Sequence, residues 1–316
     1  MIKAEKNTKI DMTAKLKKEF NREKIMRGIM PYIYILPAFL FLGLFMLQPL
    51  IYAVEKSFFR YNGGKINEFI GWANYIRIFT KDKMFWISLK NLAYFFAAMV
   101  FTFPAPLVAA ELIFNLTNKR LQNFFRTSLI IPMVVPGLVM LMIWRFIYYP
   151  GIGVFYNICR DLGVLSKDIP NLLGDILFVK PALVMIGFPW IGSLPLLVYF
   201  AALQGIDPSI LEASRIDGCG SVRRIFYIDL PAIMPQIKML FLLSAVALLQ
   251  DYEKIFIVTG GGPQNASLVP GLHMYRISFP GGGAEPEFGY SCAIAVILFI
   301  VGMAISGLVN RSKGDR

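Results

Sequence analysis

Long apolar runs alternate with short polar segments over most of the chain. Six such runs cover about 32–54, 89–114, 124–148, 181–203, 232–250 and 289–309. An α-helix rises about 1.5 Å per residue and the hydrocarbon core of a bilayer is about 30 Å thick, so each run is long enough to cross it. The pattern predicts an all-α membrane protein with six transmembrane helices.

The polar segments divide the chain into a basic tail at 1–29, a membrane domain at 30–310 and a short tail at 311–316. Six crossings would place both tails and the loops 115–123 and 204–231 on one side. Lys and Arg gather in the first tail and in these loops, and such residues favour the cytoplasmic side of a bacterial inner membrane. Both termini are therefore expected to be cytoplasmic.

Composition supports this reading over a nucleic-acid-binding one. The chain has 316 residues, 56% of them hydrophobic, and a formal net charge of +12. A basic chain can bind nucleic acid, but here the orientation of a membrane protein explains the charge better. Lipid is thus an expected partner and nucleic acid is not.

Proline and glycine recur inside the apolar runs, where soluble helices seldom tolerate them. A packed membrane bundle can accommodate them. Their positions predict kinked helices around a cavity, and the fourth run is the richest in them. They are Pro37, Pro49, Pro104, Pro106, Pro132, Pro136, Gly187, Pro189, Gly192 and Pro195.

One polar stretch between the fourth and fifth runs carries helix start and stop signals. Asp207 can cap a helix whose first residue is Pro208, and Gly218 permits a left-handed end. Ser221 can cap a second short helix, and Pro231 opens the next apolar run. The stretch is expected to be a helix-turn-helix at a membrane face.

The same stretch resembles the signature loop of permease subunits of ABC importers. Glu212-Ala213-Ser214, Gly218 and Leu230-Pro231 keep its spacing, with Ser214 in place of the second alanine. The resemblance implies the type I ABC importer permease fold with a cytoplasmic coupling helix. In that family the helix sits in a cleft of the ATP-hydrolysing subunit, so Glu212, Ala213, Ser214, Asp217 and Gly218 are the candidate coupling residues.

Two outer segments resemble those of carbohydrate permeases. They are Phe69-Ile70-Gly71-Trp72-Ala73-Asn74-Tyr75 and the Gly-Gly-Pro-x-Asn loop in 259–265, whereas the loop 279–289 is longer than in that family. The resemblance implies half of a pathway for a sugar or oligosaccharide, with glycerol phosphate or another polar solute as the alternative. The implied partners are a second, different permease, two ATP-binding subunits and an extracytoplasmic solute-binding protein.

Other functions lack the residues that they need. The glycine-rich loop 259–265 has no following Lys-Ser or Lys-Thr, so it is no Walker A motif and ATP hydrolysis is assigned to a separate subunit. A membrane enzyme would need convergent acids, bases or metal ligands, but His273 is the only histidine and is expected in a loop. We therefore expect no cofactor or metal. A secondary transporter would need ionisable residues in the middle of its spans, and the apolar runs of this chain are poor in them.

Polar residues near the membrane centre are candidates for the solute path, because burying them there is costly. Trp190 and Ser193 in the fourth run and Ser244 in the fifth are expected to face the path, with Asp251 and Tyr252 nearer its outer mouth. A tryptophan ring can stack on a sugar while hydroxyls and a carboxylate bind its OH groups. Close helix packing is an equally good explanation of the two serines.

The three cysteines test the predicted topology. Cys159 should face outside, Cys219 should be cytoplasmic and Cys292 should lie within a span, so they cannot pair with one another. An impermeant thiol reagent applied to single-cysteine variants in intact cells should modify Cys159 and spare Cys219. The reverse labelling would contradict the six-span arrangement.

Overall fold

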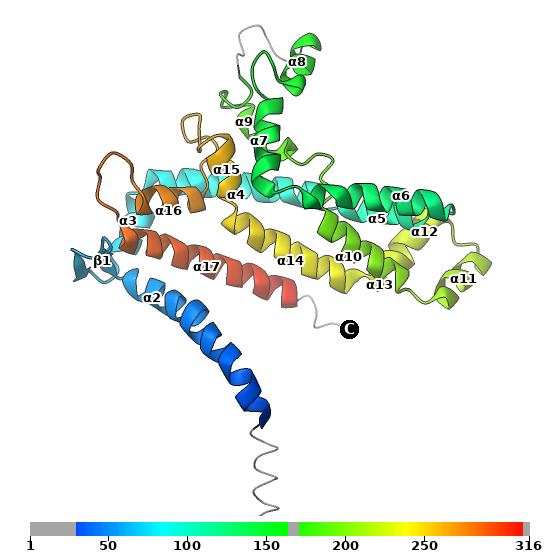
Figure 1. Cartoon of the computed structure of the whole chain (residues 1–316), viewed down its shortest axis with the longest axis horizontal. Helices are drawn as coiled ribbons and strands as arrows, with labels where there is room; N and C mark the ends of the chain where they lie inside the picture. Colours follow the sequence, from blue (N-terminus) through cyan, green and yellow to red (C-terminus); the bar gives the residue numbers. More distant parts are fainter. Residues whose placement is uncertain (1–29, 164–170, 312–316) are drawn as a thin grey trace, which may run out of the picture. The chain divides into compact units, whose positions relative to one another are not determined.

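The computed structural model describes residues 30–163 and 171–311, and these are mostly helical (Figure 1). Contacts divide the chain into two units, with the boundary between Lys56 and Ser57. By length and composition, three described helices can cross a membrane: Met30–Lys56, Lys83–Phe114 and Phe288–Val309. Three sharply bent helix pairs raise the number to as many as six, so the six-span count stays a prediction.

The first unit comprises Met1–Lys56, and its described residues form one long helix, Met30–Lys56. It contains a π-helical stretch, η1 (Gly43–Leu47), directly before α2 (Gln48–Lys56), and the Gln48 N–H bonds to the Gly43 carbonyl. The π-turn comes just before Pro49, which has no N–H to continue an α-helical ladder. The most apolar window of this helix has no residue buried in the structure, as suits a helix surrounded by lipid or by other subunits.

The second unit begins with a small hairpin that the sequence pattern did not predict. Strands β1 (Phe59–Tyr61) and β2 (Asn67–Phe69) pair antiparallel, with Phe59 opposite Phe69. Gly63 lies in the connecting turn at φ +96°, a conformation open to glycine. The short helix α3 (Ala73–Thr80) follows the hairpin.

The second predicted span is present but begins earlier than Leu89. Helices α4 (Lys83–Thr102) and α5 (Ala105–Phe114) form one helix of 32 residues. Asp82 sets its start, because the carboxylate accepts the Phe85 N–H at 2.9 Å. The predicted start was six residues late, because the polar residues Lys83 and Ser88 interrupt the apolar pattern of the first two turns.

The third predicted span is not continuous. Helix α6 (Lys119–Ile130) leads through a 3-10 turn, η2 (Ile131–Val134), into α7 (Gly137–Ile147), and the two arms are bent by 96°. Figure 1 shows α7 standing away from the line of α6. Pro132 and Pro136 remove two backbone donors at this point. A kink was predicted here from these prolines, and the observed bend is much sharper than a mild kink. Helix α8 (Val154–Asp161) follows.

The fourth predicted span is also interrupted. Helices α9 (Val179–Met185) and α10 (Ser193–Gln204) are separated by non-helical residues 186–192. Gly187 and Trp190 both have positive φ there, at 87° and 61°. This conformation ends a right-handed helix, so the kink predicted for the run 181–203 is a full interruption of the helix.

Of the remaining elements, the helices of the polar stretch, α14 and α17 follow the predicted order, whereas α15 and α16 were not predicted. Helix α14 starts two residues after the predicted 232, and α17 starts one residue before the predicted 289. The polar stretch between α10 and α14 forms short helices, as expected. The elements are α11 (Pro208–Ile216), α12 (Ser221–Arg224), the π-helix η3 (Ile225–Asp229), α13 (Leu230–Ala232), α14 (Met234–Gln250), α15 (Glu253–Val258), α16 (Pro270–Ser278) and α17 (Phe288–Arg311).

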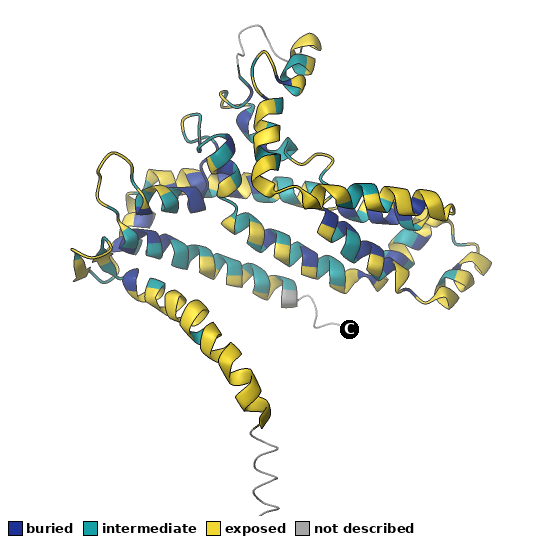
Figure 2. Ribbon diagram, viewed as in Figure 1, coloured by how far each residue is buried: buried dark blue, intermediate teal, exposed yellow. Residues whose placement is uncertain are grey.

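Four apolar clusters lie in the described part of the second unit, and two of them have eight or more buried residues. The first joins α5, α10 and the start of α14 around Ala110, Tyr199, Leu203 and Ile233. The second joins α4, α9, α15 and α16, with Phe95 among its members. In Figure 2 the buried residues lie where these helices face one another, and exposed residues cover their outer faces.

A polar contact ties together α3, the start of α4, α16 and α17. Asp82 Oδ2 lies 2.7 Å from His273 Nε2 and accepts the Tyr290 hydroxyl at 2.7 Å. Arg77 covers the Tyr290 ring, with 4.1 Å between guanidinium carbon and ring centre. His273 therefore belongs to a packed helix, α16, and the expectation of a loop residue was wrong.

Burial opposes ionisation of Asp82, but hydrogen bonds from His273, Tyr290 and the Phe85 N–H outweigh it and lower the carboxyl pKa. A depressed folded-state pKa stabilises the fold above the ordinary value near 3.8, and this stabilisation is lost as pH falls through the folded-state pKa. Asp82→Ala should cost on the order of 1–3 kcal/mol at neutral pH because it leaves buried partners unpaired.

Thermal unfolding of the purified protein in detergent measures this cost. The midpoint of Asp82→Ala should lie several degrees below that of the parent at pH 7, and the difference should narrow below pH 4. Asp161→Ala is the control, because its ion pair with Arg160 is exposed. Equal losses in both variants would contradict a special role for Asp82.

Candidate solute cavity and coupling segment

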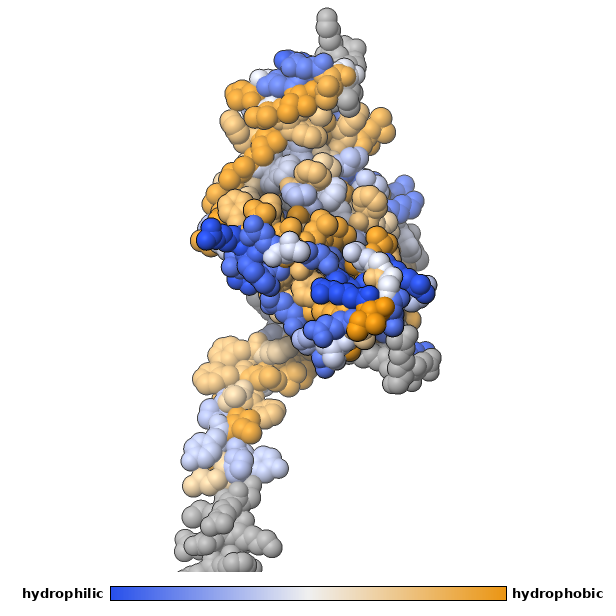
Figure 3. Space-filling model, turned by 90° about the vertical axis from the view of Figure 1, so that its right-hand side faces the viewer, coloured by the Kyte–Doolittle hydropathy of each residue, from blue (hydrophilic) through white to orange (hydrophobic). Residues whose placement is uncertain are grey.

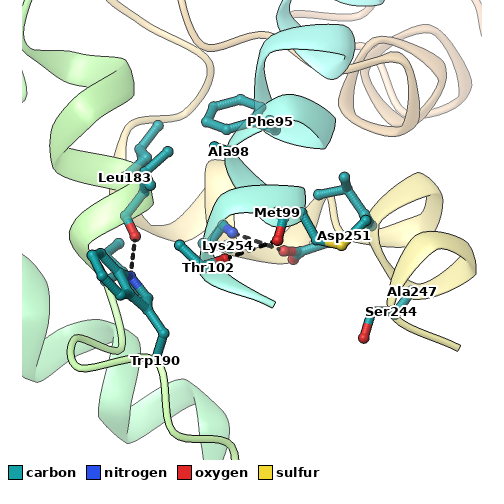
Figure 4. A pocket seen from close by; sticks show the side chains of 13 residues that line it. Phe95, Ala98, Met99, Thr102, Leu183, Trp190, Ser244, Ala247, Asp251 and Lys254 are labelled. Atoms are coloured by element: carbon teal, nitrogen blue, oxygen red, sulfur yellow. Dashed lines mark hydrogen bonds and ion pairs between the residues drawn. The ribbon is translucent and has the colours of Figure 1, made fainter. Parts of the chain in front are cut away.

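A cavity of about 350 Å³ lies between α4, α9 with the non-helical residues that follow it, α14 and the start of α15 (Figure 4). Apolar side chains supply much of its wall, and polar groups project from separate elements. It is lined by Phe95, Ala98, Met99, Thr102, Leu183, Val184, Ile186, Trp190, Ser244, Ala247, Leu248, Asp251 and Lys254.

The break between α9 and α10 places Trp190 in the cavity wall. Its indole N–H donates to the Val184 carbonyl at 2.8 Å, and its ring packs edge-to-face with Phe188 at 5.1 Å between centres, so both contacts fix the ring. Asp251 Oδ2 and Lys254 Nζ form an ion pair at 3.1 Å. The Ser244 hydroxyl also lines the cavity. It has no hydrogen-bond partner among the described residues, so it is available to a ligand.

Three of the five predicted path residues line this one cavity: Trp190, Ser244 and Asp251. Ser193 lies elsewhere, since its hydroxyl donates to the Leu129 carbonyl of α6 at 2.9 Å, as the packing explanation expects. Tyr252 stacks on Tyr275 with ring centres 5.5 Å apart.

Sequence reasoning missed two polar lining residues, Thr102 and Lys254. Thr102 is a polar residue in the second apolar run, and Lys254 lies three residues after Asp251. Both were visible as exceptions to the apolar pattern. The direction in which their side chains point could not be predicted, because these helices are largely apolar on every side and their periodicity does not identify an inner face.

The polar stretch after α10 forms the expected short helix. Asp207 caps α11 by accepting the Ser209 N–H at 2.9 Å, and Gly218 follows its end at φ +69°. The second cap was assigned wrongly. Gly220 is the N-cap of α12 and Ser221 already lies inside the helix, with no side-chain cap bond.

The coupling segment, which we define as residues 207–229, presents an exposed surface. Glu212, Ala213, Asp217 and Gly218 are exposed, whereas Ser214 is buried and donates to the Leu211 carbonyl at 2.8 Å. Large apolar side chains are exposed beside them, and Ile216 reaches 86%. In Figure 3 the end of the second unit that carries α11 faces the viewer, with apolar patches among hydrophilic residues.

The family with the description "Binding-protein-dependent transport system inner membrane component" matches residues 102–312. The chain belongs to this family. The match covers about two thirds of the chain and includes both the coupling segment and most of the cavity wall. The chain is thus a membrane-embedded permease component of a transporter, and its function is transport rather than catalysis.

Curated relatives of similar length are named as permeases. The chain is 28% identical to the probable ABC transporter permease protein YurN of Bacillus subtilis, over 88% of this chain and 94% of the relative. It is 27% identical to the lactose transport system permease protein LacF of Rhizobium radiobacter, over 90% and 94% of the two chains.

A solved structure has the same fold. A chain from a bacterial ABC transporter that imports the acidic polysaccharide alginate superposes with a TM-score of 0.78 at 20% identity, covering 93% of this chain and 99% of that chain. The expected type I importer permease fold is confirmed by this likeness.

The geometry of the coupling segment predicts how two substitutions act. Gly218→Val should cost on the order of 1–2 kcal/mol, because a β-branched residue strains positive φ, and should redirect α11. Glu212→Ala should remove an exposed charge, and with it the charged contact that the family resemblance implies for this residue. Both changes lie outside the apolar helices, so membrane insertion should survive.

Transport and solute-stimulated ATP hydrolysis of the reconstituted complexes measure the effect, and both should fall. Gly220→Ala is a matched control, since Gly220 has negative φ and an added Cβ would meet no atom within 4 Å. Normal coupling in Glu212→Ala and Gly218→Val would show that the segment is only a connector.

Proposed function

We propose that this permease forms one half of the translocation pathway for a neutral sugar or oligosaccharide in an ATP-driven importer. The cavity of Trp190, Thr102, Ser244, Asp251 and Lys254 is the observation that carries the proposal. An aromatic face, hydroxyls and a carboxylate within apolar walls can bind a polyhydroxylated ring, which offers both CH faces and OH groups.

The charges of the cavity favour a neutral solute over an anionic one. Lys254 is the cationic residue among those that line it, and Asp251 already neutralises that charge at 3.1 Å. Relatives of both kinds exist: the chain is 26% identical to the multiple sugar-binding transport system permease protein MsmF of Streptococcus mutans and 29% to the sn-glycerol-3-phosphate permease UgpA of Yersinia pestis. A phosphate would need a cation free to bind it.

The assembly we propose has a second, different permease, two ATP-binding subunits and an extracytoplasmic solute-binding protein. The exposed apolar residues of the coupling segment suit an ATP-binding partner. Another solved structure of the alginate importer, with a TM-score of 0.79, is in complex with a periplasmic protein bound to alginate pentasaccharide. We place the chain in the bacterial inner membrane with both termini cytoplasmic, in six crossings.

Uptake into proteoliposomes that contain the reconstituted importer and its binding protein tests the solute class. Labelled neutral oligosaccharides should be accumulated in an ATP-dependent way, and glycerol phosphate should not. Trp190→Ala should raise the apparent KM for the solute about fivefold, because it removes one aromatic contact worth roughly 1 kcal/mol. Ser244→Leu should act in the same direction by removing a hydroxyl and filling space.

Trp86→Ala is the matched control, since Trp86 is exposed and lies outside the cavity lining. Uptake of an anionic solute alone, or unchanged KM in both cavity variants, would overturn the assignment.

A further inference from the structure

A charged cluster lies buried where the coupling segment meets the inner end of α5. Arg224 Nε donates to Asp229 Oδ2 at 3.0 Å, and the two side chains are 9% and 0% exposed. The guanidinium also donates to Asn115 Oδ1. Asn115 Nδ2 in turn donates to the carbonyl and the carboxylate of Glu111, at 2.8 and 3.3 Å. The hydrogen bonds thus run from the coupling segment to α5.

The π-helix η3 brings the two charges of this cluster together. Arg224 and Asp229 are five residues apart, which in an α-helix puts their side chains about 140° apart around the axis. A π-helix bonds residues five apart, and here the Leu230 N–H reaches the Ile225 carbonyl. The wider turn therefore sets Arg224 and Asp229 on one side, facing α5.

The inner end of α5 is well suited to receive Arg224. A helix C-terminus carries partial negative charge on its free carbonyls, which favours a nearby cation. Gln122 of α6 already donates to the Ile113 carbonyl at 3.1 Å, and the Asn115 N–H bonds to the Glu111 carbonyl. Two neighbouring elements thus hold this helix end, α6 and the coupling segment.

The same helix reaches the solute cavity at its other half. Helix Lys83–Phe114 supplies Phe95, Ala98, Met99 and Thr102 to the cavity wall. Thr102 and Asn115 are separated by about 20 Å along a helical path. One continuous helix therefore connects the cavity wall to the buried cluster.

We propose that Arg224, Asp229, Asn115 and Glu111 form a joint that fixes the coupling segment to helix Lys83–Phe114, so that movement at the cavity is passed to the ATP-binding subunit. Arg224 and Asn115 are positioning residues in this arrangement. Glu111 Oε1 and Asp229 Oδ1 have no partner among the described residues, so the cluster has spare acceptors with which to rearrange. The inference rests on the proposed contact between the coupling segment and an ATP-binding subunit.

Asn115→Ala is the sharpest variant, because Asn115 is exposed and its helical backbone accepts alanine. Arg224→Met/Asp229→Leu removes both buried charges together, which a fold tolerates better than the loss of one. Complexes reconstituted with their partners are measured for co-purified ATP-binding subunit and for the ratio of solute-stimulated to basal ATP hydrolysis. A merely structural role would change the yield of complex and leave this ratio unaltered.

Both variants should retain the ATP-binding subunit. Their ratio of solute-stimulated to basal ATP hydrolysis should be about tenfold lower than that of the parent. Asn118→Ser is the control, since serine preserves the cap of α6, and it should keep the ratio of the parent. An unchanged ratio in both joint variants, or loss of the ATP-binding subunit from them, would overturn the joint.

Glu212→Ala, measured in the same way, separates this inference from the function on which it rests. If Glu212→Ala uncouples and Asn115→Ala does not, the joint is wrong and the coupling contact stands. If neither uncouples, the proposed contact itself is wrong.

Discussion

Backbone polar groups inside an apolar environment need hydrogen-bond partners, and this constraint governs how the second unit can depart from regular helices. At two places prolines and positive φ end a helix within an apolar run, and side chains then bind carbonyls near the broken ends. The Trp190 indole takes the Val184 carbonyl near the end of α9. Ser193, at the start of α10, takes the Leu129 carbonyl near the end of α6. The two interruptions thus support each other.

The interruptions also shape the cavity. A straight fourth helix would carry Trp190 on a helical face, whereas the break at 186–192 holds it against Val184 and beside the wall formed by α4 and α14. Similar side-chain hydrogen bonds satisfy backbone carbonyl groups elsewhere in the second unit. Tyr148 donates to the Ala182 carbonyl at 2.8 Å, and Asn91 to the Leu268 carbonyl at 2.9 Å. The residues that let the chain leave the helical path therefore also define part of the wall of the cavity.

The positions of several helices could be predicted from the sequence, whereas the breaks within them and the faces on which their side chains lie could not. Apolar length located α14 and α17, and cap chemistry located α11 from Asp207 to Gly218. Prolines indicated kinks, but they do not distinguish a mild kink from the 96° bend between α6 and α7, which depends on what can bind the freed carbonyls.

The direction of side chains was harder to predict for the same reason. Helices that are apolar all round have no marked inner face, so Thr102 was missed and Ser193 was assigned to the path. The Arg224–Asp229 pair was invisible to α-helical periodicity, because only the π-turn of η3 brings residues five apart together.

The distribution of buried charge bears on how the permease takes up energy. A transporter driven by protons or ions needs ionisable groups in its solute path. Here the charged pair of the cavity, Asp251 and Lys254, is self-neutralised. Among the described ion pairs, the most deeply buried one, Arg224 with Asp229, lies instead where α5 meets the coupling segment. Burying Arg224 and Asp229 is costly unless their geometry is well defined, so such a pair specifies one arrangement of its two elements. That arrangement fixes the segment whose exposed residues can meet another subunit, which is where a permease driven by ATP hydrolysis requires a defined connection.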